Sequence, residues 1–142
     1  MTSQLTKISV EVEVQAPLEK TWKLWTTPSD IIQWNFPSND WHTPNAEADL
    51  KDGGNFLFRM ETKDGSMGFD HGGTYDKIIT NTLIQYTVSD GRKSTIEFIP
   101  TGDSTLIIET FDAELVTPID MQREFCLGVL NSFKKYAERV SE

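Results

Sequence analysis

The sequence predicts an α+β fold in which one long C-terminal helix closes over the concave face of a curled, seven-stranded antiparallel sheet. Three patterns carry this prediction. Residues 5–15 alternate between apolar and polar side chains, as in a strand with one buried face. Residues 46–112 are short alternating segments separated by turn pairs, which is typical of successive hairpins. Residues 118–140 have apolar side chains three and four apart, the pattern of an amphipathic helix that needs an apolar surface to lie on.

The first strand and the two short helices expected after it are defined by their apolar positions. The buried face of the strand consists of Ile8, Val10, Val12 and Val14. Pro17 is suited to opening a helix. The next apolar residues recur at intervals of four and three: Leu18, Trp22 and Trp25. Residues 27–29 interrupt this helix, and a second one is predicted over residues 29–34.

Residues 35–45 contain two prolines and the aromatic residues Phe36 and Trp41, and we interpret them as a loop. Large aromatic side chains in a loop either plug the end of a core or form the rim of a pocket.

Five turn pairs divide the central part of the chain: Asp52-Gly53, Asp64-Gly65, Thr80-Asn81, Asp90-Gly91 and Gly102-Asp103. An Asp-Gly pair between alternating runs favours a type I′ hairpin turn, in which both central residues have positive φ. Including the first strand, the predicted strands number seven, and the six after the helices are residues 46–51, 54–62, 67–79, 83–89, 93–100 and 104–112. Because they follow one another through short turns, we expect them to be antiparallel.

One face of this sheet is rich in large side chains. The inward positions of the second and third of these strands carry Phe56, Phe58, Met60, Phe69, His71, Gly73 and Tyr75. This volume exceeds what a sheet–helix interface needs, so a cavity is predicted between the two. Gly72-Gly73 suggests a bulge or a sharp bend. In residues 104–112 the apolar content does not decide whether Glu109 and Phe111 or their neighbours point inward.

The long helix has Thr117 as a candidate N-cap, Pro118 as its first residue and Asp120 in place for a capping-box contact. Gly128 leaves a gap in the side-chain cover near its middle, so Gly128→Leu, like Val129→Trp, is expected to fill the pocket. Cys126 lies on the inward face, where we interpret it as a small buried hydrophobe rather than a reactive thiol.

Composition excludes several classes of protein. The chain has 142 residues, which predicts one domain over residues 1–142, and a formal net charge of −9, which argues against nucleic acids and anionic membranes as partners. Its apolar runs are too short for a membrane span. No apolar secretion signal opens the sequence and there is one cysteine, so we expect a cytoplasmic protein.

No cofactor or metal is predicted. The only histidines, His42 and His71, lie far apart and lack other ligands at recognisable spacing. The glycines fall at turns, and neither a phosphate-binding loop nor a nucleophile elbow is present, so no catalytic residue is assigned.

The order of elements resembles the helix-grip fold of the START-like, polyketide cyclase (SRPBCC) superfamily. Several stretches are similar to its bacterial branch related to the activator of a heat-shock-protein ATPase: residues 16–22, 25–28, 32–34, 49–56, 64–70, 73–75, 109–112 and 121–123. This resemblance implies a deep cavity between the sheet and the last helix. Carried over position by position, its lining would include Trp34, Trp41, Phe56, Phe58, Met60, Phe69, His71, Tyr75, Tyr86, Phe98, Glu109, Phe111, Met121, Phe125 and Val129. His71 departs from the aromatic or aliphatic residue that relatives carry there, and it would be a polar handle or a solvent-facing position.

Within such a cavity Glu109 could act with His71, Tyr75 or Tyr86 to orient a ligand or move a proton. Desolvation would raise the pKa of an inward Glu109. The alternative is that Glu109 lies on the outer face or is neutralised by a structural hydrogen bond.

Three classes of function remain. The first is binding of a small apolar or aromatic molecule, which needs a roomy cavity. The second is an enzyme of the cyclase or hydrolase kind, which also needs a converging acid–base pair. The third is a protein-interaction module acting on a chaperone ATPase; we expect the chain to lack the second, N-terminal domain on which that activity depends in the eukaryotic activators. A homodimer through residues 46–50 or the first strand stays open, although the charged residues there are typical of protected sheet edges.

Overall fold

One antiparallel sheet of seven strands forms the body of the molecule in the computed structural model, which describes residues 6–140. The elements follow the predicted order: β1 (Lys7–Val14), α1 (Leu18–Thr26), α2 (Pro28–Trp34), β2 (Trp41–Ala48), β3 (Asn55–Thr62), β4 (Gly68–Ile79), β5 (Leu83–Val88), β6 (Lys93–Thr101), β7 (Ser104–Asp112) and α3 (Ile119–Val140). The spatial order β1-β7-β6-β5-β4-β3-β2 confirms the predicted fold class. Leu5, where the first strand was expected to begin, lies outside the described residues.

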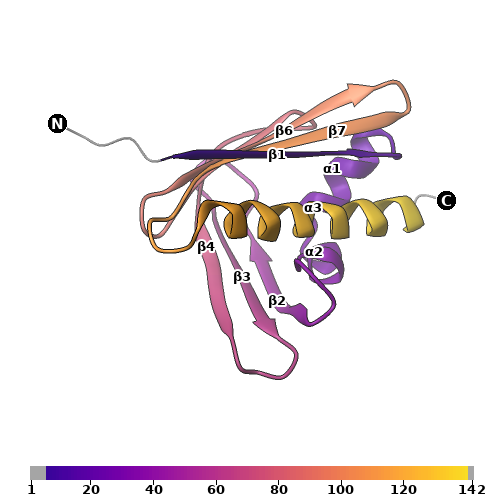
Figure 1. Cartoon of the computed structure of the whole chain (residues 1–142). Helices are drawn as coiled ribbons and strands as arrows, with labels where there is room; N and C mark the ends of the chain where they lie inside the picture. Colours follow the sequence, from indigo (N-terminus) through magenta and orange to yellow (C-terminus); the bar gives the residue numbers. More distant parts are fainter. Residues whose placement is uncertain (1–5, 141–142) are drawn as a thin grey trace.

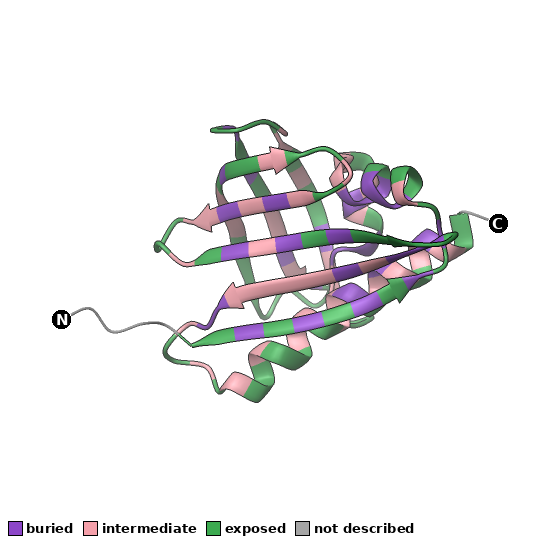
Figure 2. Cartoon of the chain, turned by 90° about the horizontal axis from the view of Figure 1, so that it is seen from above, coloured by how far each residue is buried: buried purple, intermediate pink, exposed green. Residues whose placement is uncertain are grey.

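The sheet curls around α3. Figure 1 shows β1, β6 and β7 on one side of this helix and β2, β3 and β4 turning away on the other, with α3 lying across the concave face. Along β1 buried and exposed residues alternate without interruption (Figure 2), as the period of two predicts. No helix within residues 6–140 is both long and apolar enough to cross a membrane.

The register of β7 answers the question that its sequence left open. Val12 pairs with Ile107 and Val10 with Glu109, so these side chains share the face on which β1 is buried. Ile107 is fully buried in the core. By the period of two, Glu109 and Phe111 therefore point to the concave face, which excludes the alternative of an outward Glu109.

The predicted turns form, but through different backbone geometry. The glycines of the Asp-Gly pairs, Gly53, Gly65 and Gly91, have positive φ, while none of the aspartates does. The Gly65 N–H donates to Thr62 C=O at 3.0 Å, and the Gly91 N–H donates to Val88 C=O at 2.9 Å. At these two turns the glycine is therefore the fourth residue, and the prediction of type I′ turns is wrong because only that residue takes the left-handed conformation.

Two further expectations are wrong: a loop over residues 41–45 and a bulge at Gly72-Gly73. Residues 41–45 are not a loop, because β2 begins at Trp41; a register break between His42 and Asn45 accommodates Pro44, which an edge strand tolerates. In β4 the break lies between Tyr75 and Lys77 and not at Gly72-Gly73. A Cβ atom on Gly73 would overlap the carbonyl oxygen of Thr87, so this glycine permits a close approach of β5.

An aromatic core holds α1 and α2 against the C-terminal half of α3. The ring centroid of Trp25 lies 4.6 Å from that of Trp34, and Phe133 of α3 packs 4.9 Å and 4.8 Å from these two rings. The Trp34 indole N–H donates to the Leu24 carbonyl at 3.0 Å, so its one polar atom is satisfied inside the core.

The first turn of α3 is not held by the predicted capping box. The Asp120 carboxylate pairs with Arg123 at 3.0 Å. The Gln122 side chain instead binds the segment before the helix: its amide nitrogen donates to the carbonyls of Thr117 (2.7 Å) and Glu114 (3.1 Å), and its oxygen accepts from the Glu114 N–H (2.9 Å). Gln122 thereby anchors the connection between β7 and α3.

Candidate ligand cavity

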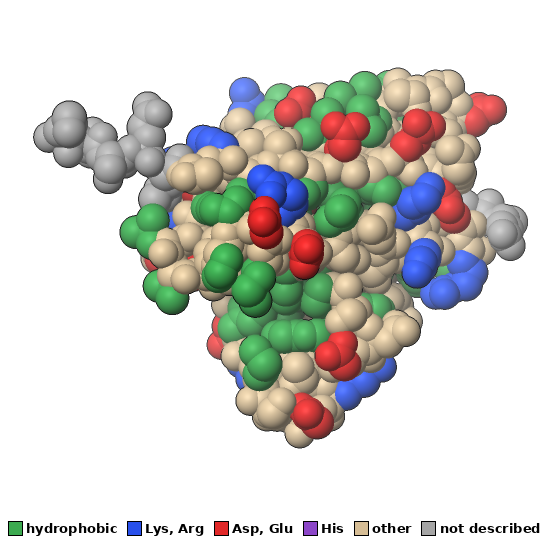
Figure 3. Space-filling view, in the orientation of Figure 1, with side chains coloured by type: hydrophobic (Ala, Val, Ile, Leu, Met, Phe, Trp, Pro, Cys, Tyr) green, Lys and Arg blue, Asp and Glu red, His purple; other side chains and the backbone are tan. Residues whose placement is uncertain are grey.

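A cavity of about 510 Å³ lies between the concave face of the sheet and the N-terminal half of α3. Strands β3 to β7 contribute most of its wall, and the ends of α1 and α2 and the β7–α3 connection complete it. Apolar side chains gather around a hollow in the surface below α3 (Figure 3). The same helix that packs tightly at its C-terminal end thus covers a space at its beginning.

Aromatic rings from neighbouring strands form one wall of the cavity. Phe56 lies at the centre, with ring centroids 5.3 Å from Phe58, 5.0 Å from Tyr75, 4.9 Å from Tyr86 and 5.5 Å from His71. The register explains this cluster, because the partners Phe58 and His71, and Tyr75 and Tyr86, are directly opposite across adjacent strands. Their side chains therefore stand on the same face of the sheet.

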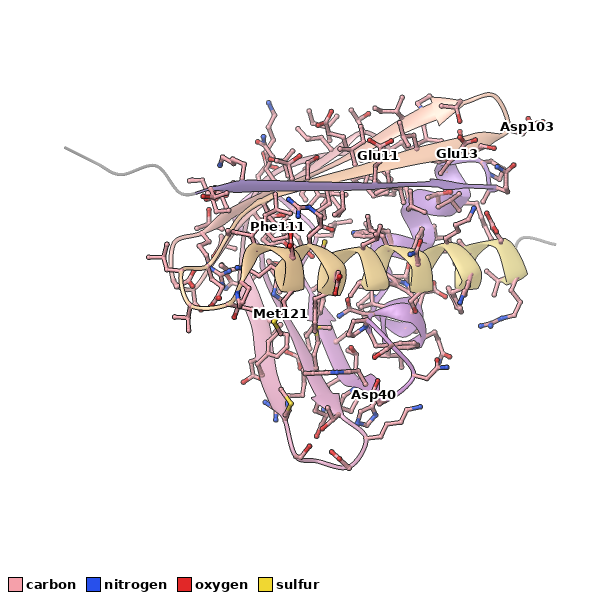
Figure 4. The ribbon with its side chains drawn as sticks, in the orientation of Figure 1. Glu11, Glu13, Asp40, Asp103, Phe111 and Met121 are labelled. Carbon is pink, nitrogen blue, oxygen red and sulfur yellow. The ribbon has the colours of Figure 1, made fainter. Side chains whose placement is uncertain are left out.

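The structure brings together at this cavity all but two of the side chains expected to line it: Trp34, Phe56, Phe58, Met60, Phe69, His71, Tyr75, Tyr86, Glu109, Phe111, Met121, Phe125 and Val129. Figure 4 shows Phe111 above the beginning of α3 and Met121 below it, so these two residues flank the helix at this end. The acidic residues Glu11, Glu13 and Asp103 lie on the outer side of the sheet or at its far turn. A role of the lining residues in binding stays a prediction.

Trp41 and Phe98 do not line the cavity. Phe98 is buried beneath α1, where its ring packs 5.0 Å from Trp22 and 5.9 Å from Trp25. Trp41 lies behind the wall, with its ring edge-on to Phe69 at 6.1 Å and to Phe125 at 5.6 Å. Both are inward aromatic residues, but packing neighbours rather than open space cover them.

Glu109 is an acidic group in the cavity wall whose side chain points to the concave face of the sheet. Burial raises its pKa from 4.5 to about 7, and the neighbouring Cys126 and Ser94 act in the opposite direction without cancelling this effect. No Lys, Arg or His side chain among residues 6–140 forms an ion pair with it. The carboxyl group therefore changes charge near neutral pH while it faces an apolar space.

His71 pairs with Tyr86 and not with Glu109. The Tyr86 hydroxyl lies 3.4 Å from His71 Nε2. Burial, and then the charge of Arg92, lowers the pKa of His71 to about 4, so the imidazole is neutral at pH 7. Burial also raises the pKa of Tyr86 well above its usual value and that of Tyr75 to about 12. Glu109 is consequently the one of these four groups that titrates near neutrality.

The thiol of Cys126 is held protonated. Burial and the nearby Glu109 carboxylate raise its pKa. A protonated, half-buried thiol is a poor nucleophile, in agreement with its interpretation as a small apolar residue. Within residues 6–140 no group of three His, Cys, Asp or Glu side chains is placed to hold a metal ion.

Sequence reasoning missed several residues of the wall. Ser94 shares a face of β6 with Ile96 and Phe98, so strand alternation could have found it. Asn35 closes the C-terminal end of α2 and had no recognisable signal in the sequence. Arg92 and Lys93 also contribute to the wall, just before and at the start of β6.

Gly128 does not open onto the cavity, which corrects the expectation that Gly128→Leu would fill it. A Cβ atom there would lie 2.5 Å from the carbonyl oxygen of Pro37. The glycine allows the chain after α2 to pass directly against α3. Val129 does line the cavity and is the position at which a larger side chain would occupy it.

Comparison with known proteins places these features in a family. A family model described as "Activator of Hsp90 ATPase homolog 1-like protein" matches residues 15–138. The solution structure of the AHSA1-like protein from Aeromonas hydrophila is 37% identical, with a TM-score of 0.88 over 95% of this chain and 94% of that one. A protein from Cytophaga hutchinsonii is 51% identical, with a TM-score of 0.81 over 94% and 93%. A protein from Nitrosomonas europaea, 16% identical with a TM-score of 0.81 over 99% and 98%, shares the fold. No curated protein matches significantly.

Proposed function

We propose that this chain, which belongs to the activator of Hsp90 ATPase homolog 1-like family, binds a small apolar or aromatic molecule in the cavity between its sheet and α3. The observation that carries the proposal is the cavity itself. Its volume of about 510 Å³ is in the range typical of small-molecule sites, and apolar side chains, many of them aromatic, form most of its wall.

The expected affinity follows from the apolar surface that a ligand would bury. About 250 Å² of apolar ligand surface removed from water contributes roughly 6 kcal/mol before the costs of association are subtracted. Such a ligand would bind the folded protein alone and increase its free energy of unfolding by about 2.7 kcal/mol at a hundredfold excess over its Kd. The melting temperature would rise accordingly.

The test is a thermal-shift screen of the purified protein against diverse apolar and aromatic molecules. Val129→Trp places a large side chain in the cavity, and Leu127→Trp adds the same side chain to the same helix at a position outside the cavity wall. We expect hits whose shift is lost in Val129→Trp and kept in Leu127→Trp. Shifts that persist equally in both variants, or no shift with any molecule, would contradict binding in this cavity.

A second candidate function is modulation of a chaperone ATPase, which the family's name suggests. An interaction of this kind needs exposed apolar surface. Leu115 and Val116, in the connection between β7 and α3, are 87% and 90% exposed. The double variant Leu115→Ser, Val116→Ser tests this candidate in an ATPase assay with an Hsp90-type chaperone. A rate change that the variant abolishes would support it, and no effect of the wild-type protein on the rate would remove it.

A further inference from the structure

Two buried polar atoms in the cavity wall form no hydrogen bond of good geometry within residues 6–140: the amide nitrogen of Asn35 and the hydroxyl oxygen of Ser94. The Ser94 hydroxyl lies close enough to Glu109 and Tyr86 to lower the pKa of both, but it is not aligned with either. The two residues are only 7% and 5% exposed. Folded proteins rarely leave such groups unpaired, so each one calls for an explanation. Their shared location in one cavity wall points to a common explanation.

Ser94 belongs to a polar corner of the sheet. It pairs with Tyr86 on β5 and with Phe111 on β7, and Glu109 lies diagonally across on the same face. Ionised Glu109 can only accept hydrogen bonds, and it has no cationic partner within residues 6–140. This corner therefore offers acceptors to an incoming hydroxyl or amine hydrogen, and Ser94 adds a group that both donates and accepts.

Asn35 belongs to a different element of the cavity wall, because it directly follows α2. Its backbone is fully used, because its N–H donates to the Ile31 carbonyl at 2.9 Å and its C=O accepts the Thr43 hydroxyl. These two bonds hold the residue in place, so its side-chain amide is kept at the cavity wall without a protein partner. The amide nitrogen can donate two hydrogen bonds to an oxygen acceptor.

We propose that the ligand of this cavity is a mainly aromatic molecule with hydrogen-bonding groups at two separated ends: a carbonyl-type acceptor for the Asn35 amide and a hydroxyl or amine group for Ser94 and Glu109. This inference rests on the proposed function and narrows its ligand to a chemical class. The aromatic wall around Phe56 lies in the same cavity and would receive the apolar middle of the molecule.

Three probes with one skeleton test the inference: biphenyl, 4-hydroxybiphenyl and 4-acetyl-4′-hydroxybiphenyl. Their Kd values are measured with the wild-type protein by titration calorimetry or by quenching of tryptophan fluorescence. We expect affinity to rise along the series, by roughly threefold to tenfold for each polar group that finds its partner. Equal affinity for all three would overturn the two-ended ligand while leaving apolar binding in place. Failure of all three to bind, together with an empty thermal-shift screen, would overturn the proposed function and this inference with it.

Substitutions in the cavity wall test which residue binds each polar group of the probe. Ser94→Ala should reduce the gain that the hydroxyl group brings, since only Glu109 is then left to bind it, and should leave the Kd of biphenyl unchanged. Asn35→Ala should remove the gain from the acetyl group. Ser9→Ala, on the exposed face of β1, is the matched control and should change none of the three values. The melting temperature of each variant without probe shows whether it is folded. If both cavity variants bind every probe as the wild type does, ordered water rather than a ligand satisfies these groups, and the inference is wrong.

Discussion

The two halves of α3 have the same apolar pattern and very different surroundings. In the C-terminal half Leu130, Phe133 and Ala137 are completely buried. In the N-terminal half Phe125, Cys126 and Val129 are only partly buried, and Met121 is 59% exposed. The difference is not in the helix but in what faces it, because α1 and α2 pack against the last turns and the curled sheet recedes from the first turns.

The two halves of α3 therefore differ in how much they contribute to stability. Packed atoms contribute dispersion and burial energy, whereas side chains beside a cavity give up part of both. The packed half of α3 therefore contributes more to the stability of the fold than the half beside the cavity.

The sharpest test exchanges a phenylalanine in each half for alanine. Phe133→Ala removes a fully buried ring that contacts Trp25 and Trp34, and should lower the free energy of unfolding by about 3–5 kcal/mol. Phe125→Ala, at the cavity, should cost only about 1 kcal/mol, because its ring is partly exposed. Urea denaturation measures both values. Equal losses would show that the two halves do not differ in packing.

Glu109→Gln tests whether the cavity half contains a destabilising charge. Because burial raises the pKa of Glu109 to about 7, the folded protein holds this proton more tightly than the unfolded chain does. The resulting stability is complete below pH 4.5 and is lost as the pH rises through 7. Between pH 4.5 and 7 the free energy of unfolding of the wild type should fall by up to about 3 kcal/mol relative to that of Glu109→Gln. The fall should be smaller if water in the cavity solvates the carboxylate.

The measurement is the free energy of unfolding of both proteins at several pH values from 4 to 8, compared as a difference so that the other titrating groups cancel. A difference that does not change with pH would mean that Glu109 is as well solvated in the folded state as in the unfolded chain.

Gly128→Ala tests the point where the two halves meet. At an exposed helical position this change stabilises by about 1 kcal/mol. Here the added Cβ would lie 2.5 Å from the Pro37 carbonyl oxygen, so strain of about 1–3 kcal/mol should outweigh the gain and lower the melting temperature. A stabilised variant would show that the segment after α2 does not press against α3.

Tyr136→Phe is expected to have the smallest effect on stability. It should alter only the packed, C-terminal half of α3. The Tyr136 hydroxyl donates to the Asp30 carboxylate at 2.6 Å and so links α3 to α2. Its loss should cost about 1 kcal/mol in thermal or urea unfolding. Affinity for any ligand of the cavity should not change, because neither residue belongs to its wall. A changed Kd would indicate that the two halves are coupled.

Local patterns made most of the fold predictable. Alternation in residues 8–14, the turn glycines and the spacing from Met121 to Val140 depend on a few neighbouring residues, and the structure confirms the elements that they indicated. The predictions that are wrong concern residues whose conformation depends on a segment distant in the sequence. Strand β2 begins early because it pairs with β3, and Gly72-Gly73 is not a bulge because β5 needs room beside it.

The cavity was only partly predictable. Inward strand positions indicated most of its wall, but Phe98 has the same local pattern and is covered by the rings of α1. Trp41, which was expected in a loop, packs against Phe69 and Phe125 instead of lining the cavity. Alternation alone could not assign Glu109, since both faces of β7 carry apolar residues, and pairing with β1 was needed to do so. The place of Asn35 in the cavity wall could not be predicted from the sequence around it. It depends on the hydrogen bond from Thr43 and on the strands that form the rest of the wall.

The periods of two and of three to four, together with the turn residues, already specified seven strands and a long terminal helix, because backbone geometry and side-chain direction are local properties. The curl of the sheet then determined where α3 packs and where it leaves a cavity, which polar groups stay unpaired, and how far the pKa of Glu109 rises. Those properties depend on burial by residues far apart in the chain, and burial is defined only once the strands and helices are assembled.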